Sequence, residues 1–249
     1  MVKKKSIKKR KAVKLTAKEK EELKMEGEIP KKSIREKENK QLIWFFVIIG
    51  IVFATVPILY FGIQGAKHFE YSDIEWVIEE YPNLKIFHGK FMALSGADIS
   101  YNIFLRNDPR KNDIYTEGVF DKFKYGGIIS FSPDVDKCRG ELSRAMVDAG
   151  AFLRRGVGVG DIEIGSTNET VADNDENKRF AQCDTILDRT VVIVEIGESS
   201  VIQNTENPYC YTINIESCSD IRPIEKFMVK SVEDFMLAKE ALKENSETA

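Results

Sequence analysis

The most apolar part of the chain is a run without charged residues from 41 to 63, QLIWFFVIIGIVFATVPILYFGI. As a helix rising 1.5 Å per residue, this run would extend about 35 Å and could cross a hydrocarbon core of about 30 Å. Trp44 and Tyr60 lie near its ends, where aromatic rings favour the membrane–water interface. A cleaved signal peptide would have a shorter apolar region and a shorter charged leader. The pattern therefore predicts one retained transmembrane helix over 41–63.

After this run the spacing of apolar residues changes. Ser72 precedes the segment DIEWVIEEY, which predicts a short amphipathic helix that ends at Pro82. The next two runs, LKIFHGKFMAL and DISYNIFLRN, alternate in polarity and flank Gly96, which is typical of paired strands. We therefore expect a membrane-proximal helix and β-module over 64–115.

The following segment has the order strand, helix, strand. The apolar run GGIISFS predicts a strand, and Ser132, Pro133 and Asp134 after it begin a helix, VDKCRGELSRAMVDAGAFLRRG, that ends at Gly156. The apolar residues of this helix recur at spacings of three and four, which is typical of a face packed on a core. The run VGVGDIEIG then predicts a second strand. In such a βαβ unit the two strands are parallel.

A polar loop from Ser166 to Arg179 precedes three more strand-like runs, RTVVIVEIG, SSVIQN and YCYTINIES. The short turns between these runs predict an antiparallel meander. An amphipathic helix over about 224–243 and a polar tail over 244–249 complete the chain. We therefore expect residues 116–243 to form an α/β domain, a half-Rossmann-like mixed sheet with helices packed on it.

The net charge of −3 conceals a strong asymmetry along the chain. Residues 1–40 contain 16 Lys and Arg against 7 Asp and Glu, whereas the other 209 residues contain 21 basic and 33 acidic residues. Because basic residues flanking a transmembrane helix stay in the cytoplasm, this bias predicts a cytoplasmic N-terminus and an extracytoplasmic C-terminal domain. The expected location is the cell membrane, with a single span.

The basic arm over 1–40 is expected to be mostly disordered, because its first part has few apolar residues. Three roles are open for it: a topogenic signal alone, contact with anionic lipid head groups, or contact with nucleic acid or ribosomes. Lysine predominates and no aromatic residue is interleaved, so nucleic acid is not the expected partner. The lipid-contact candidates are Lys3, Lys4, Lys5, Lys8, Lys9, Arg10, Lys11 and Lys14.

All four cysteines follow the predicted span, and an even number in an extracytoplasmic domain favours disulfides. If 210–218 is a strand, Cys210 and Cys218 are about 26 Å apart, beyond the 4.4–6.8 Å that a disulfide allows. In an up-down-up arrangement, Cys183 and Cys210 both precede upward strands, while Cys138 and Cys218 both follow upward strands. The sequence therefore predicts the bridges Cys183–Cys210 and Cys138–Cys218.

Enzyme-like features are few. Cys138 at the predicted start of a helix could be an acidified, nucleophilic thiol, but a disulfide is the simpler interpretation. Zinc is a poor alternative because there is no CxxC pair, and His68 and His88 lie far from the cysteines in sequence. The glycines from Gly156 to Gly160 end a helix rather than begin one, so they indicate a cap and turn rather than a phosphate loop. Asn168 begins a glycosylation sequon on a predicted loop.

Three stretches of the sequence carry a resemblance to other proteins. The run from Tyr101 to Arg110, the strand–Ser-Pro-Asp–Cys–helix unit, and CYTINIESC with the downstream Glu225, Lys226 and Phe227 resemble motifs in a group of uncharacterised single-pass archaeal membrane proteins. The resemblance covers most of 40–235 and implies an archaeal envelope location. Because that group has no assigned activity, the resemblance assigns no catalytic residue and no cofactor.

Two hypotheses about function follow. The first is a membrane-anchored binding or assembly module of the cell envelope, with the lipid bilayer and another envelope protein as partners. The second is an extracytoplasmic thiol-disulfide or hydrolytic enzyme that uses Cys138.

Overall fold

The computed structural model describes residues 31–96 and 98–247. The chain divides into two compact units, one that ends at Gly62 and one that begins at Ile63. Helix α2 (Lys31–Ala66) belongs to the first unit except for its last four residues, and its stretch Lys40–Gly62 is long and apolar enough to cross a membrane. The large apolar side chains of that stretch, such as Trp44, Phe53 and Phe61, are exposed, as expected for a helix whose apolar surface faces lipid.

The second unit begins with a four-stranded antiparallel sheet, here called the small sheet. Its strands, in spatial order, are β1 (His68–Tyr71), β2 (Ile74–Tyr81), β3 (Leu84–Met92) and β4 (Ser100–Leu105). One face is buried in the core and carries Ile74, Trp76, Phe87, Phe91, Ile103 and Leu105. The expected pairing of the two strands around Gly96 is confirmed, since β3 and β4 are antiparallel neighbours.

The helix predicted after Ser72 is wrong, because this segment is strand β2. Ser72 and Asp73 both have positive φ, 53° and 56°, so they form a tight turn between β1 and β2 instead of capping a helix. Ile74 and Trp76 then point into the core while Glu75 is exposed, which is the alternation of a strand with one buried face.

The large sheet has seven strands in the order β5-β10-β11-β9-β6-β7-β8. The bounds are β5 (Tyr115–Glu117), β6 (Gly127–Phe131), β7 (Ile162–Ser166), β8 (Arg179–Phe180), β9 (Thr190–Ile196), β10 (Val201–Asn204) and β11 (Cys210–Ile215). The expected parallel pair is confirmed, since β6 and β7 run parallel. The antiparallel meander is wrong: β11 lies between β9 and β10 and runs parallel to β9. Five consecutive residues of β9 are buried, as in a central strand covered on both faces.

The described part of the second unit also contains six helical segments. They are η1 (Pro109–Lys111), η2 (Val135–Lys137), α3 (Glu141–Ala151), η3 (Phe152–Val157), α4 (Glu169–Asp173) and α5 (Arg222–Glu247). The continuous helix expected from Val135 is interrupted, because Gly140 has a φ of +74° and starts α3 as a separate helix. The predicted C-terminal helix is confirmed as α5. The short helix α4 lies within the segment from Ser166 to Arg179, which the sequence predicted to be a polar loop.

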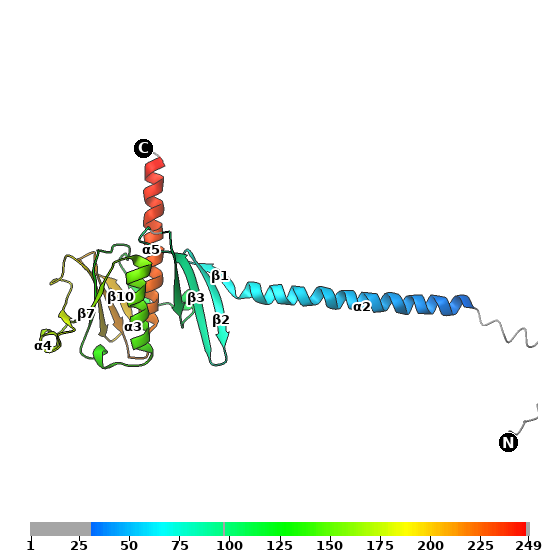
Figure 1. Ribbon diagram of the computed structural model, residues 1–249, viewed down its shortest axis with the longest axis horizontal. Coiled ribbons are helices and arrows are strands. Elements are labelled where there is room, and N and C mark those ends of the chain that lie inside the picture. Colours follow the sequence, from blue (N-terminus) through cyan, green and yellow to red (C-terminus); the bar gives the residue numbers. More distant parts are fainter. Residues whose placement is uncertain (1–30, 97, 248–249) are drawn as a thin grey trace, which may run out of the picture. The chain divides into compact units, whose positions relative to one another are not determined.

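Helices α3 and α5 lie between the two sheets, so the domain has three layers (Figure 1). A single apolar core contains residues from both sheets and both helices. The other face of the large sheet is covered in part by the segment around Ala181 and Ile186, which packs on Ile128, Val191 and Ile193. The overall class is therefore α/β with one antiparallel and one mixed sheet.

Candidate functional site

A concave surface that combines apolar walls with charged groups runs between α3 and the strands β6 and β7; we call it the α3–β7 groove. Its volume is about 300 Å³, at the lower end of ordinary ligand sites. The lining residues are Ile129, Phe131, Val135, Asp136, Cys138, Arg139, Leu142, Ser143, Met146, Val147, Gly150, Ile162 and Ile164. Most of this surface is apolar, and the charged residues Asp136 and Arg139 both come from the segment just before α3.

The groove exists because the middle layer contains only two long helices in the described part of the chain. Helix α5 packs on β10 and β11, while α3 follows β6, so the strip of sheet at β7 lacks a helix of its own. As a result Ile164 on β7 is 51% exposed and Val147 on α3 is 71% exposed. Apolar side chains on facing walls of a concave surface indicate a place where an apolar partner would remove them from water.

Gly150 contributes to the depth of this groove. A Cβ atom at this position would meet only Ile129 Cδ1, at 3.6 Å, which is an ordinary contact. Alanine would therefore fit, and in a helix interior it is favoured over glycine by about 1 kcal/mol. Packing within the domain therefore does not require a glycine at this position. A ligand that lies along α3 would explain one, because a side chain here would occupy its space.

The charges at the mouth of the groove are not equally compensated. The Asp136 carboxylate accepts a hydrogen bond from Lys178 Nζ at 2.6 Å. Arg139 Nη1 donates to the carbonyl oxygens of Asp136 and Cys138, at 2.9 and 3.0 Å. Among the residues that the structure describes, no carboxylate lies within the 4 Å of an ion pair from Arg139. Arg139 is thus the one groove-lining charge that has only backbone partners.

Cys138 lies in the wall of the groove and is bridged to Cys218, while Cys183 is bridged to Cys210. Both pairs have Cα atoms 5.4 Å apart, and these are the pairs expected from strand direction. Cys138 is not at a helix N-terminus, contrary to the sequence interpretation: it ends η2, and its N–H donates to the carbonyl of Val135 at 2.9 Å. The helix N-terminus that would acidify a thiol is therefore missing at this position.

The other candidate residues are dispersed over the domain. Asn168 is exposed and caps α4, since its Oδ1 accepts from the N–H of Val171 at 3.1 Å. His88 lies on the outer face of the small sheet between Glu79 and Asn102, at 3.0 and 3.1 Å, whereas His68 is exposed on β1. As expected, the glycine-rich segment after α3 is a cap, with Gly158 in the left-handed conformation.

Within the described ranges no group of three or more His, Cys, Asp and Glu residues could hold a metal ion. The lipid-contact candidates from Lys3 to Lys14 lie outside the described residues.

The sequence did not predict the burial of Glu225, a glutamate that is only 1% exposed. Its carboxylate accepts hydrogen bonds from the N–H of Arg106 at 2.6 Å and from the N–H and Nδ2 of Asn107 at 3.1 and 2.7 Å. Burial raises the pKa of Glu225, and these donors oppose that change. These contacts join the end of β4 to the first turn of α5, so Glu225 is a structural residue. Because a glutamate in the first turn of a helix is usually exposed, nothing in the sequence indicated that this one is buried.

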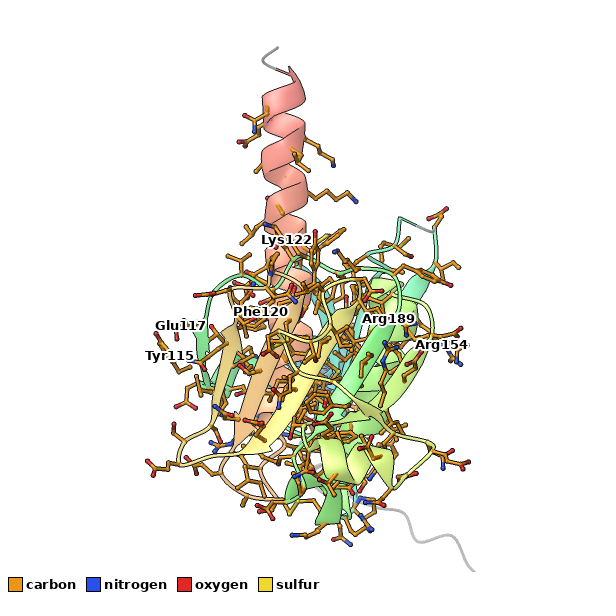
Figure 2. All side chains as sticks on the ribbon, turned by 90° about the vertical axis from the view of Figure 1, so that its left-hand side faces the viewer. Tyr115, Glu117, Phe120, Lys122, Arg154 and Arg189 are labelled. Carbon is orange, nitrogen blue, oxygen red and sulfur yellow. A yellow bond between two sulfur atoms is a disulfide. The ribbon has the colours of Figure 1, made fainter. Side chains whose placement is uncertain are left out.

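The edges of the large sheet carry different side chains. Tyr115 and Glu117 mark the β5 edge in Figure 2, well away from the β7 side of the sheet. Gln203 on β10 donates to Glu117 at 2.8 Å, so the polar side chains of these two strands pair with each other. The α3–β7 groove, with its apolar walls and its arginine, is therefore the better candidate site.

Comparison of the chain with protein-family models, with curated proteins and with solved structures finds no match in any of the three. What the protein binds must therefore be inferred from the geometry of the domain itself.

Proposed function

We propose that the protein is a single-pass membrane protein whose disulfide-bonded α/β domain lies outside the cytoplasm and binds an apolar ligand in the α3–β7 groove. The observation that carries this proposal is the uncovered apolar strip of β7 beside α3, where Val147 and Ile164 are exposed on facing walls. A module of the cell envelope that captures a ligand or partner at the membrane surface needs both an anchor and such a site.

Three further features support the location. The stretch Lys40–Gly62 has the length and composition of a membrane anchor. The 16 basic residues in 1–40 favour a cytoplasmic N-terminus. Two disulfides, with no free cysteine among the described residues, are typical of oxidising compartments. An archaeal envelope, which the sequence resemblance implies, is compatible with all three.

The alternative of a thiol enzyme that uses Cys138 has less support. Its sulfur is bonded to Cys218, and its backbone position offers no helix N-terminus to stabilise a thiolate. We therefore propose a binding module and not an enzyme.

Protease accessibility tests the orientation. Protease added to right-side-out vesicles should digest 64–249 and spare 1–40, because the domain is proposed to face outward. Digestion of 1–40 with protection of the domain would contradict the proposed location.

Binding of a neutral apolar probe tests the site. Dodecanol should bind the full chain in nanodiscs of phosphatidylcholine, above its background in empty nanodiscs. Gly150→Leu should abolish this excess, because the added side chain occupies the groove. The matched control is Arg155→Leu, which adds a leucine at an exposed position that does not line the groove. Equal binding by the wild type and Gly150→Leu would refute the groove as the site.

A further inference from the structure

We propose that the natural ligand of the α3–β7 groove is an anion with a long apolar chain, such as a fatty acid or an anionic lipid. The chain lies along the apolar walls, and the anionic head pairs with Arg139. This inference rests on the proposed function and deepens it by assigning a ligand class.

The walls fit an extended apolar chain. Ile129, Ile162 and Ile164 form the floor on two neighbouring strands, and Met146 and Val147 form the wall on α3. The absence of a side chain at Gly150 keeps the space between floor and wall open, although alanine would be tolerated there. A chain placed in the groove would remove Val147 and Ile164 from water and gain about 0.8 kcal/mol per buried methylene.

The mouth fits an anionic head group. Arg139 is held in place by two backbone carbonyl oxygens, which orient the guanidinium without neutralising it. The neighbouring Asp136 carboxylate would repel an anion, but Lys178 compensates it at 2.6 Å. A carboxylate or phosphate at Arg139 could accept charge-assisted hydrogen bonds from the remaining guanidinium N–H groups.

The short connection to the membrane anchor would keep the domain close to a source of such a ligand. Strand β1 begins at His68, only six residues after the apolar stretch ends at Gly62. That length of chain reaches at most about 20 Å, so a domain on this anchor stays beside the bilayer. Amphiphilic anions are concentrated at membrane surfaces, where their chains partition with the lipid.

The experiment compares two probes with the same chain, laurate and dodecanol, on the full protein in phosphatidylcholine nanodiscs at pH 8. Laurate should bind about tenfold to a hundredfold more tightly than dodecanol, as expected for a charge-assisted hydrogen bond. Arg139→Gln should reduce the affinity for laurate to that for dodecanol and leave dodecanol binding unchanged. Arg154→Gln is the matched control, because Arg154 pairs with Asp161 at 3.4 Å and does not line the groove.

The possible failures separate the two proposals. If dodecanol and laurate bind equally and Arg139→Gln has no effect, the anion assignment is overturned while the groove remains a binding site. If Gly150→Leu binds both probes as well as the wild type, the groove itself is refuted. A second measurement in nanodiscs that contain phosphatidylglycerol distinguishes the two sources of the anion. If phosphatidylglycerol competes with laurate, and this competition requires Arg139, the anion is a membrane lipid. If the affinity for laurate is the same as in phosphatidylcholine nanodiscs, the anion is a free fatty acid.

Discussion

Gly89 occupies the most crowded glycine position on the inner face of the small sheet. A Cβ atom there would lie 2.7 Å from Ile103 Cγ2, and 2.8 Å from both Ile74 Cγ2 and Trp76 Cζ3. These three side chains are buried, so they have little room to move. Gly89→Ala should therefore lower the free energy of unfolding by about 1–3 kcal/mol. Urea denaturation of residues 63–249, followed by tryptophan fluorescence, measures this change.

Gly150→Ala is the matched control for this prediction. It introduces the same methyl group, but into the open groove and at a helical position, so it should leave stability unchanged or raise it by up to about 1 kcal/mol. If Gly89→Ala were as stable as Gly150→Ala, the close packing of Trp76 over β3 would be wrong.

Glu225 makes stability depend on pH with a defined sign. Because burial raises its folded-state pKa above the ordinary value of 4.5, the folded protein holds this proton more tightly than the unfolded chain. The contribution to stability is therefore full below about pH 4.5 and declines as the pH rises through the raised pKa. Glu225→Gln removes this decline, but it also places an amide among the donors of Arg106 and Asn107. We expect the variant to be less stable by about 1–3 kcal/mol in acid, with a deficit that shrinks toward neutral pH.

Denaturation of the wild type and Glu225→Gln over a pH series measures this difference, with Glu198→Gln as a control at an exposed turn. A deficit that grows as the pH rises would show that the pKa of Glu225 is lowered instead.

Ser72 and Asp73 illustrate why a local pattern can mislead. A serine before an acidic amphipathic segment is a common helix start, and glycine or asparagine is the usual sign of a tight turn. Both residues nevertheless adopt positive φ, because Ile74 and Trp76 gain more by packing in the core of the small sheet. The strand was visible only in the alternation of Ile74 and Trp76 with Asp73 and Glu75.

At the scale of elements, the types of most strands and helices could be predicted, whereas the order of the strands could not. Short turns favour neighbouring strands, but β11 inserts between β9 and β10 through contacts that are remote in sequence. The disulfide pairs depend on strand direction and not on strand order. Because β9 and β11 do run parallel, the pairs agree with the structure although the meander does not. The α3–β7 groove could not be predicted, since it depends on which strip of sheet the helices leave uncovered.

The two disulfides differ in their access to solvent, which predicts an order of reduction. Cys218 is exposed and Cys138 is 5% exposed, whereas Cys210 is fully buried and Cys183 is half-buried. Thiol–disulfide exchange requires that a thiolate reach one of the two sulfur atoms. A mild dithiol should therefore open Cys138–Cys218 first by attack at Cys218, with Cys138 as the leaving thiolate. Alkylation at successive times and peptide mapping identify the cysteines that are released.

In urea both bridges should be reduced at similar rates, because burial no longer protects Cys210. In the chain-entropy description Cys183–Cys210 is worth about 3.5 kcal/mol and Cys138–Cys218 about 4.5 kcal/mol, so loss of the first bridge to open should also lower the melting temperature. Alkylation of Cys183 and Cys210 before the other pair in the folded protein would contradict this order.

At the scale of the whole molecule, three chemically distinct parts follow one another: a basic arm, an apolar stretch and an acidic domain. The part after residue 40 carries 33 acidic and 21 basic residues. Helix α5 also extends beyond the sheets, where Leu237 and Leu242 are 53% and 71% exposed (Figures 1 and 2). A negative domain on a short tether would be repelled by an anionic surface, while the basic arm would be attracted to one. The positive charge of the arm and the negative charge of the domain therefore favour the same orientation, with the arm and the domain on opposite sides of the membrane.

This separation of charge predicts that the arm binds anionic membranes. Each basic residue near an anionic surface contributes about 1 kcal/mol, and salt screens the attraction beyond a Debye length of about 8 Å at physiological ionic strength. A peptide of residues 1–40 should therefore bind vesicles that contain phosphatidylglycerol and dissociate as the salt concentration rises. Its control is the same peptide with the eight basic residues between Lys3 and Lys14 replaced by glutamine, which should bind much more weakly. Sedimentation of peptide with vesicles measures the bound fraction. Equal binding to neutral vesicles, or binding that salt does not weaken, would exclude charge as the cause of membrane binding by the arm.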